Sequence, residues 1–488
     1  MAARSTLLGI ARRAMIARGL APDFSPAALA QLEAIGGPVL SAPGAVSDRR
    51  NLPWCSIDND DSEDLDQLSV AEQLPEGGVR LRVAVADVAS TVCPGTAIDA
   101  HAGQNTTSVY TAAKVFPMLP EKLSTNLTSL GPGQDRLAVV VAMEFDKSGV
   151  PGGSSVEVAL VRNHAKLAYG SVGSWLEGTG PLPQAIGAVP GLDTNLRMQS
   201  EAAGRLRALR HTNGALTLET LQARPVFFGD QLTGLVLERG NRATELIEDL
   251  MIAANGVVAR FLGAKGLPSI RRVVRTPKHW DLIVALAAKA SFALPREPDA
   301  KALEDFLVSA RKSNPSGFPD VSLSVIKLLG SGEYVVDRPG QSSPGHFGLA
   351  VKDYAHTTAP NRRYPDLLVQ RLIKAAIAGS PPPYSGEELE SLAAHCTAQE
   401  NTAKKVERSV GKSAAAMLLR PRIGDSFDAI VTGAADKGTW VRIFDPPVEG
   451  RLVAGCSGAR VGARLRVRLV SAEVERGFID FTALPAAK

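Results

Sequence analysis

The chain has 488 residues, of which 45% are hydrophobic and 21% are charged, and its 54 lysines and arginines nearly balance its 50 aspartates and glutamates. This length predicts about two to four domains with buried cores. No apolar stretch approaches the roughly 18 residues that a membrane span needs. The four scattered cysteines contain no C-x-x-C pair, which argues against a disulfide framework or a zinc ribbon. We therefore expect a soluble, cytoplasmic protein that binds no membrane and whose total charge identifies no partner.

The first 50 residues form a basic, helical segment. Four arginines precede the first acid, Asp23. Helical spacing over 4–19 and the Ser25-Pro26 start signal predict two short helices. These helices are either a cap on the main body, which we favour slightly, or part of a helix-turn-helix unit. A basic N-terminus of this kind is also typical of an organellar import signal, the alternative to a cytoplasmic location.

Residues 51–417 show no convincing linker and predict one large α+β domain. Leu137–Phe145 is a continuous apolar run, as expected of a buried strand. Helical periodicity dominates later in the chain, in the ranges 246–254, 282–293 and 367–377. Strands and helices do not alternate regularly, so a doubly wound sheet is not expected.

Residues 418–488 change to short strands separated by turns. Five strands in about 60 residues predict a small Greek-key barrel of the OB-fold type. In its fourth strand, Arg464, Arg466 and Arg468 alternate with apolar residues and therefore share one face. That face is either a solvated surface or, as in many OB barrels, a nucleic-acid-binding surface.

The most informative stretch is an acidic run between two strand-like segments. It contains six carboxylates within nine residues, at Asp58, Asp60, Asp61, Glu63, Asp64 and Asp66. The run is either a solvated acidic loop or a site for hard divalent cations, which prefer oxygen ligands. A calcium loop of the EF-hand type is excluded, because Glu63 stands where that loop needs glycine.

The run SIDNDDSEDLDQ resembles the aspartate signature of the ribonuclease II / ribonuclease R family of 3′→5′ exoribonucleases. Further blocks that resemble the family follow in the same order, in the ranges 107–130, 164–177, 247–255 and 346–373. The C-terminal barrel is similar to the S1 domain of that family. The resemblance implies a Mg²⁺-dependent enzyme, with Mn²⁺ as a substitute ion, that hydrolyses single-stranded RNA to nucleoside 5′-monophosphates.

The resemblance also implies roles for individual residues. Asp58, Asp64 and Asp66 match metal-binding and catalytic aspartates, and Arg362 matches the arginine that holds the scissile phosphate. Gln67 stands where the family usually has a fourth aspartate, and this departure puts a second metal ion in doubt. Other implied RNA-binding residues are Tyr110, Tyr169, Leu218, Glu248, Asn255, Arg363, Tyr364 and Glu407. Leu218 replaces a second aromatic side chain of the family that stacks on the terminal base.

The family's front cold-shock barrels have no room in the 53 residues before Trp54, and the lysine-rich tail of ribonuclease R is not found. The reduced RNA-gripping surface predicts an enzyme that stalls at stable duplexes. We also expect a monomer with no protein partner. One alternative, motivated by Gln67 and Leu218, is a catalytically weak RNA-binding protein. The other is a metal-dependent phosphodiesterase that acts on DNA.

Overall fold

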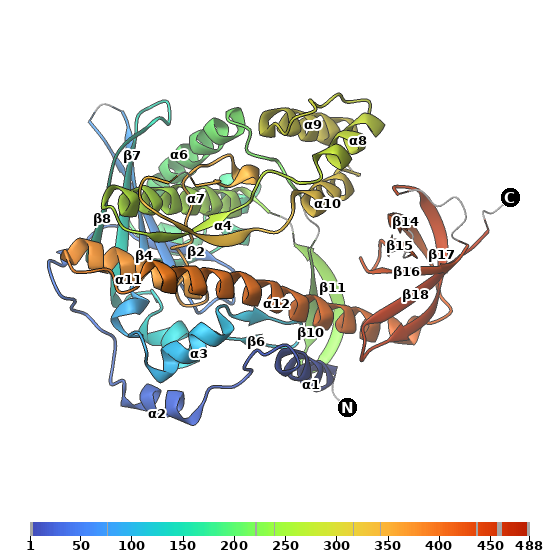
Figure 1. The fold of residues 1–488 in the computed structure, drawn as a ribbon, viewed down its shortest axis with the longest axis horizontal. Helices are drawn as coiled ribbons and strands as arrows, with labels where there is room; N and C mark the ends of the chain where they lie inside the picture. The colour runs from blue at the N-terminus through green and yellow to red at the C-terminus, as the bar shows by residue number, and fades with distance from the viewer. Residues whose placement is uncertain are drawn as a thin grey trace.

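A computed structural model describes residues 3–75, 77–219, 222–238, 240–315, 317–341, 343–435, 438–455 and 461–485 (Figure 1). The helices are α1 (Ala3–Ile16), α2 (Pro26–Ala34), α3 (Ala97–Asn105), α4 (Tyr169–Leu176), α5 (Gln184–Gly187), α6 (Leu192–Thr212), α7 (Arg242–Ala264), α8 (Trp280–Lys289), α9 (Ala300–Ser313), α10 (Phe318–Leu329), α11 (Tyr364–Ala378) and α12 (Gly386–Leu419). The strands of the main domain are β1 (Ser47–Asp48), β2 (Cys55–Asp58), β3 (Gln67–Gln73), β4 (Val79–Ala86), β5 (Val109–Tyr110), β6 (Val115–Phe116), β7 (Asp135–Phe145), β8 (Pro151–Arg162), β9 (Ala165–Ala168), β10 (Gln222–Phe228), β11 (Gln231–Glu238), β12 (Ser269–Val273) and β13 (Glu333–Asp337).

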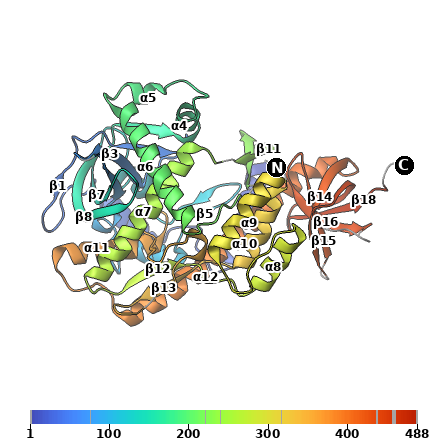
Figure 2. The same ribbon diagram turned by 90° about the horizontal axis from the view of Figure 1, so that it is seen from above.

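The centre of the main domain is a seven-stranded mixed sheet with the strand order β1-β8-β7-β4-β3-β2-β9. The apolar run predicted as a buried strand is β7, and its residues from Arg136 to Met143 are all buried. Helices α6 and α7 pack against this sheet (Figures 1 and 2). Helices α8, α9 and α10 form a smaller unit with its own core, which includes Phe306 and Phe318. The prediction of a mixed α+β domain is confirmed.

The C-terminal segment is a closed five-stranded barrel with the order β14-β15-β16-β18-β17. Its strands are β14 (Ser426–Ala435), β15 (Gly438–Ile443), β16 (Glu449–Ala454), β17 (Arg464–Glu473) and β18 (Phe478–Ala483). The predicted OB-type barrel is therefore confirmed. As expected from their alternation, Arg464, Arg466 and Arg468 are all exposed on β17, whereas Val467 between them is buried.

The 34-residue helix α12 connects the two domains without a linker. It begins at a capping box, in which Ser385 and Glu388 satisfy each other's backbone N–H groups. Its last turn carries Ala416 and Leu419 into the core of the barrel. The predicted boundary between residues 417 and 418 falls inside this continuous helix. The helix continues past the boundary, and its end forms part of the barrel's core.

The two N-terminal helices cover the main domain. Helix α1 lies against α12 and β11, and α2 lies against α3 (Figure 1). Leu7, Ala11 and Met15 of α1 are fully buried in these contacts. Both N-terminal helices therefore pack on other elements of the chain and do not stand apart from it.

Among the residues that the structure describes, no helix is long and apolar enough to span a bilayer. Cys55, Cys93 and Cys396 are unpaired. The fourth cysteine of the sequence, Cys456, lies outside the described residues.

Candidate functional site

The acidic run is the loop between β2 and β3, and contacts with a distant segment hold it in place. The backbone N–H of Leu65 donates to Ser129 Oγ (3.1 Å), and that hydroxyl donates to the carbonyl of Glu63 (2.7 Å). The N–H of Leu130 donates to the carbonyl of Leu65 (2.9 Å). These bonds fix the second half of the loop against the main domain.

The loop divides its carboxylates into two groups. Asp60, Asp61 and Glu63 are exposed to solvent. Asp58 and Asp64 are half-buried, and Asp66 is only 1% exposed. The three inward residues are those that the family resemblance assigns to the metal site, whereas the outward three carry the features of an ordinary solvated loop.

Asp66 is paired with the loop that precedes α11. Its Oδ1 accepts the backbone N–H of Asn361 (3.1 Å), and its Oδ2 accepts Nε–H of Arg362 (3.2 Å). Burial raises the pKa of Asp66 to about 7, although Arg362 opposes that shift and Asp64 adds to it. Burial also raises the pKa of Asp64, again against the effect of Arg362. Removal from water is the main cause of both shifts. When Asp58, Asp64 and Asp66 are all ionised, their three charges also exceed the single charge of Arg362.

The Arg362 guanidinium is the counterpart of these carboxylates. Burial by itself would lower its pKa, but Asp66, Asp64 and Asp58 raise the pKa of this arginine above its usual value. Its side chain remains 41% exposed while Nε is bound to Asp66. The Tyr110 hydroxyl also makes a hydrogen bond with this guanidinium, and the remaining exposed part of the planar group is available for an anionic ligand such as a phosphate.

The predicted metal ligands do not form a complete coordination site. Within the described residues, no group of three histidine, cysteine, aspartate or glutamate side chains is placed to hold a metal ion. Oδ1 of Asp58 accepts bonds from its own loop, from Asn59 N–H (2.7 Å) and Ser62 Oγ (3.0 Å). Gln67 is almost buried at the start of β3. The oxygen atoms of three carboxylates and one amide are ligands of the kind that hard divalent cations prefer. The excess negative charge of these groups also favours the binding of a cation.

Tyr110 stands beside this charged cluster. Its backbone N–H donates to Glu407 Oε1 of α12 (2.8 Å). The neighbouring N–H of Ser108 donates to the carbonyl of Arg362 (3.0 Å). Tyr110 is 44% exposed, and the charges of Arg362 and Asp64 both influence the pKa of its hydroxyl, which burial raises. The sequence segments of Tyr110, Arg362 and Glu407 are therefore brought together, with Glu407 supporting Tyr110.

Two of these residues, Tyr110 and Glu407, line a cavity of about 880 Å³, whereas Arg362 is not among its lining residues. Asp64, Tyr110, Asn361 and Glu407 contribute to its wall, as do Arg4 of α1 and Arg224 of β10. The sequence analysis did not single out Asn361, and it pointed to Arg4 only as one of the four arginines of the basic N-terminal segment. The position of Asn361 next to Arg362 was a usable signal, whereas nothing in the sequence connects Arg4 with residues more than 50 positions away.

Tyr169 is the first residue of α4, and Glu248 and Asn255 lie on α7. Burial raises the pKa of Tyr169 to about 12, and the Asp58 charge adds to this shift, so the phenol lies near Asp58. Glu248 is exposed on α7. Asn255, two turns later, is only 1% exposed, and its Oδ1 accepts both the N–H (2.9 Å) and the Oγ–H (2.7 Å) of Thr357. Asn255 therefore holds the protein's own backbone and leaves little surface for RNA.

Three other predicted residues lie away from the cavity wall. Leu218 packs against the core of the α8–α10 unit. Tyr364 is only 5% exposed, and its hydroxyl donates to Asp99 (3.1 Å). Arg363 donates to the fully buried Asp366 (2.7 Å). For Tyr364 the expected RNA contact is not compatible with this position, because its ring is enclosed in the core.

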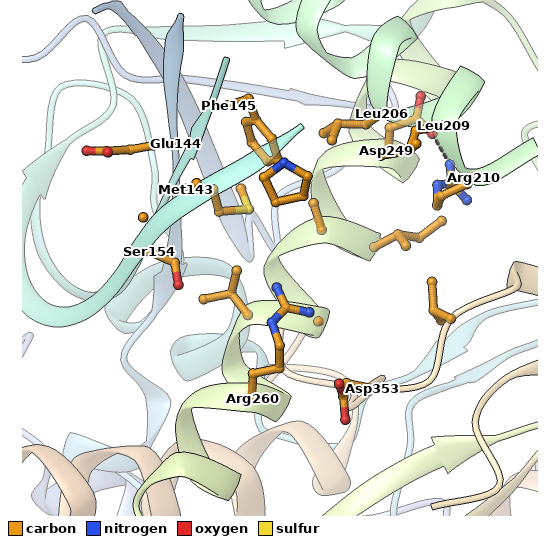
Figure 3. A pocket seen from close by; sticks show the side chains of 18 of the residues that line it. Met143, Glu144, Phe145, Ser154, Leu206, Leu209, Arg210, Asp249, Arg260 and Asp353 are labelled. Carbon is orange, nitrogen blue, oxygen red and sulfur yellow. Dashed lines mark hydrogen bonds and ion pairs between the residues drawn. The ribbon is translucent and has the colours of Figure 1, made fainter. Parts of the chain in front are cut away.

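A second cavity, of about 330 Å³, lies between strands β7 and β8 and helices α6 and α7 (Figure 3). Met143, Phe145 and Leu206 give it apolar walls, and its Arg210 and Asp249 form an ion pair with each other. Among the described residues, it shares no lining residue with the cavity at Tyr110. It is therefore separate from the candidate site.

Comparisons with known proteins match both domains. The RNB domain model matches residues 46–379, and the model of the RNase II-type exonuclease C-terminal S1 domain matches residues 425–484. Ribonuclease R of Escherichia coli (strain K12) is 30% identical over 478 residues, which cover 90% of this chain and 58% of that protein. The chain thus spans less than two thirds of this relative.

Solved structures of Mycoplasma genitalium RNase R share the fold. The complex with ribose methylated single-stranded RNA matches with a TM-score of 0.87 at 22% identity, and covers 98% of this chain and 78% of that one. The complex with double-stranded RNA matches with a TM-score of 0.85 at 23% identity, and covers 98% and 83%.

Proposed function

Because this chain belongs to the RNB family, with a C-terminal S1 domain of the RNase II type, we propose that it is a 3′→5′ exoribonuclease that releases nucleoside 5′-monophosphates from single-stranded RNA. The observation that carries the proposal is the pairing of the buried Asp66 with the half-exposed Arg362 beside Tyr110. A buried carboxylate cluster, one arginine and one accessible aromatic ring are the groups that binding a terminal nucleotide and its phosphate requires.

In the proposed reaction, water attacks the last phosphodiester phosphorus. The bond from phosphorus to the preceding 3′ oxygen breaks, the released nucleotide keeps its 5′-phosphate, and the shortened chain keeps a 3′-hydroxyl. Arg362 binds the phosphate through the part of its guanidinium that Asp66 does not occupy, and Tyr110 stacks on the terminal base. Tyr169 and Glu248 contact the ribose, where a carboxylate that accepts from the 2′-hydroxyl favours RNA over DNA.

Asp58, Asp64 and Asp66 would hold Mg²⁺, with Gln67 as a neutral neighbour. The ion, when bound, lowers the pKa of the attacking water and neutralises charge on the phosphate. Burial and the excess negative charge of the loop support this assignment, because both make a bound cation favourable.

The cavity at Tyr110 has a volume of about 880 Å³, which is within the range of about 300–1,000 Å³ typical of small-ligand pockets. We propose that this cavity accepts a short single strand and not a duplex. We therefore propose that a stable stem halts degradation a few nucleotides before the duplex begins.

The test is a degradation assay on 5′-labelled RNA and DNA of the same sequence, each with Mg²⁺ or with EDTA. The proposal expects an RNA-only, Mg²⁺-dependent ladder that shortens from the 3′ end and stops before a stable stem. Asp66→Asn should abolish the ladder, whereas Asp60→Asn, a matched change on the exposed side of the same loop, should leave it intact. Equal cleavage of DNA would contradict the ribose role of Glu248.

A second candidate function is RNA binding without efficient cleavage. Two observations favour it: the neutral Gln67 beside Asp66, and the packing of Leu218 on the α8–α10 unit. This candidate expects tight binding of RNA in the same assay mixtures and no ladder under any metal condition.

A further inference from the structure

The cavity at Tyr110 is walled partly by segments that the proposed reaction does not use. Three cationic side chains from different parts of the chain line it: Arg4 of α1, Lys114 between β5 and β6, and Arg224 of β10. Phe227 of β10 lines it as well. We refer to these four residues as the entrance rim.

Arg4 is held at the rim by the β10–β11 hairpin. Its guanidinium carbon lies 4.9 Å from the centre of the Phe227 ring, and its backbone N–H donates to the carbonyl of Asp230 in the hairpin turn (3.3 Å). The next turn of α1 is anchored by Leu7, which is fully buried. A guanidinium stacked on a ring keeps its N–H edges free to donate, so Arg4 is pre-organised to bind an anion.

The entrance rim also has an exposed ion pair, and an exposed aromatic ring lies next to it. Arg224 approaches Asp61 at 3.9 Å, with side chains that are 59% and 79% exposed. An ion pair this open contributes little energy, so Asp61 does not prevent Arg224 from contacting a phosphate in the cavity. Phe228, the neighbour of Phe227, is 83% exposed at the hairpin turn. Cationic groups interleaved with aromatic rings are the usual surface for single-stranded nucleic acid.

We propose that the entrance rim binds the phosphate backbone of the RNA upstream of the scissile bond, so that α1 and the β10–β11 hairpin act together as an RNA guide. This proposal rests on the proposed function for the identity of the polymer. It assigns a nucleic-acid contact to the N-terminal helix and gives the hairpin a role in substrate binding.

The test is the salt dependence of RNA binding by the full chain in EDTA, measured by fluorescence anisotropy with a 5′-labelled 20-nucleotide oligouridylate. Each lost phosphate contact should lower the slope of log K against log salt by about 0.7 for a single strand. Arg4→Ala and Arg224→Ala are each expected to reduce the slope by this amount and to weaken binding several-fold. Arg18→Ala is the matched control, because Arg18 donates to the carbonyl of Ala14 and, among the described residues, is not part of the cavity wall.

Arg4→Lys separates charge from packing. Lysine keeps the positive charge but not the planar stack on Phe227, so the slope should stay near that of the unmodified protein. The proposal is overturned if Arg4→Ala matches Arg18→Ala, or if Arg4→Lys loses as much slope as Arg4→Ala. Because the readout is binding without cleavage, it remains informative if the unmodified protein produces no ladder, a result that would refute the proposed function alone.

Discussion

Replacing Asp66 with asparagine should stabilise the metal-free protein while it removes activity. The pKa of Asp66 is raised, mainly by burial, to about 7 from an ordinary 3.8, and a difference of roughly three pKa units corresponds to about 4 kcal/mol. The folded protein binds a proton here that the unfolded chain has already lost. Stability contributed by this site is therefore highest at low pH, falls as pH rises toward 7, and stays low above it.

Asparagine removes the buried charge at the cost of one charge-assisted hydrogen bond to Arg362. The pKa of about 7 already includes the favourable effect of Arg362 on the charged carboxylate, so about 4 kcal/mol is the upper limit of the gain at pH 8. An amide that leaves the Nε–H of Arg362 without an acceptor loses about 1–3 kcal/mol of it, and a net gain of about 1–3 kcal/mol remains. The assay is thermal unfolding at pH 5 and pH 8, in EDTA and in Mg²⁺, with Asp60→Asn as the exposed control. We expect a melting temperature a few degrees higher for Asp66→Asn in EDTA at pH 8, and a smaller difference at pH 5.

Mg²⁺ should reverse the order of the two melting temperatures. A ligand that binds only the folded state adds about 2.7 kcal/mol to the free energy of unfolding at one hundred times its Kd. The unmodified protein gains this energy and Asp66→Asn does not. If Asp66→Asn were less stable than the unmodified protein in EDTA at pH 8, the inference that Asp66 is an uncompensated buried charge would be wrong.

Three further predictions follow from single residues. Gln67→Asp adds a carboxylate beside Asp66, so the Mg²⁺ concentration for half-maximal activity should fall and stability in EDTA should decrease; an unchanged Mg²⁺ titration would exclude Gln67 from the metal site. Tyr110→Ala should raise the KM for RNA by about 5- to 150-fold, since base stacking is worth about 1–3 kcal/mol, whereas Tyr110→Phe should retain the normal KM. Burial lowers the pKa of His101 to about 4, so the imidazole stays neutral in the folded protein where it is protonated in the unfolded chain. The free energy of unfolding should therefore decrease as pH falls from about 6.5 toward 4, by about 2 kcal/mol between pH 7 and pH 5. His101→Gln should flatten that part of the pH profile of the melting temperature.

The sequence predicts the elements of the fold better than their connections. The barrel strands could be recognised because turns separate short alternating runs. The continuity of α12 into the barrel could not, because Ala416 and Leu419 fit an amphipathic helix whichever domain they contact. Their position in the barrel core depends on strands that follow later in the chain.

Within the candidate site, sequence spacing predicted that the carboxylates lie close together, but not which of them are buried. Ser129 and Leu130, more than 60 residues from the start of the acidic run, decide which side of the loop is buried. Polar groups used inside the core were the main source of error. Tyr364 and Asn255 have side chains suited to binding RNA, but both make hydrogen bonds inside the protein. Tyr364 bonds to Asp99, and Asn255 bonds to Thr357.

The two adjacent arginines before α11 show how one short motif serves both structure and binding. Arg363 pairs with Asp366, which is fully buried and also accepts the backbone N–H of Ala359 (2.8 Å), so this pair fixes the shape of the loop. Arg362 pairs with Asp66 through Nε and remains 41% exposed. Two neighbouring cations repel each other, and each therefore needs its own carboxylate. With the loop held by the first pair, the second arginine is free to exchange part of its contact with Asp66 for a phosphate, and a cation bound to the acidic loop would make that exchange favourable.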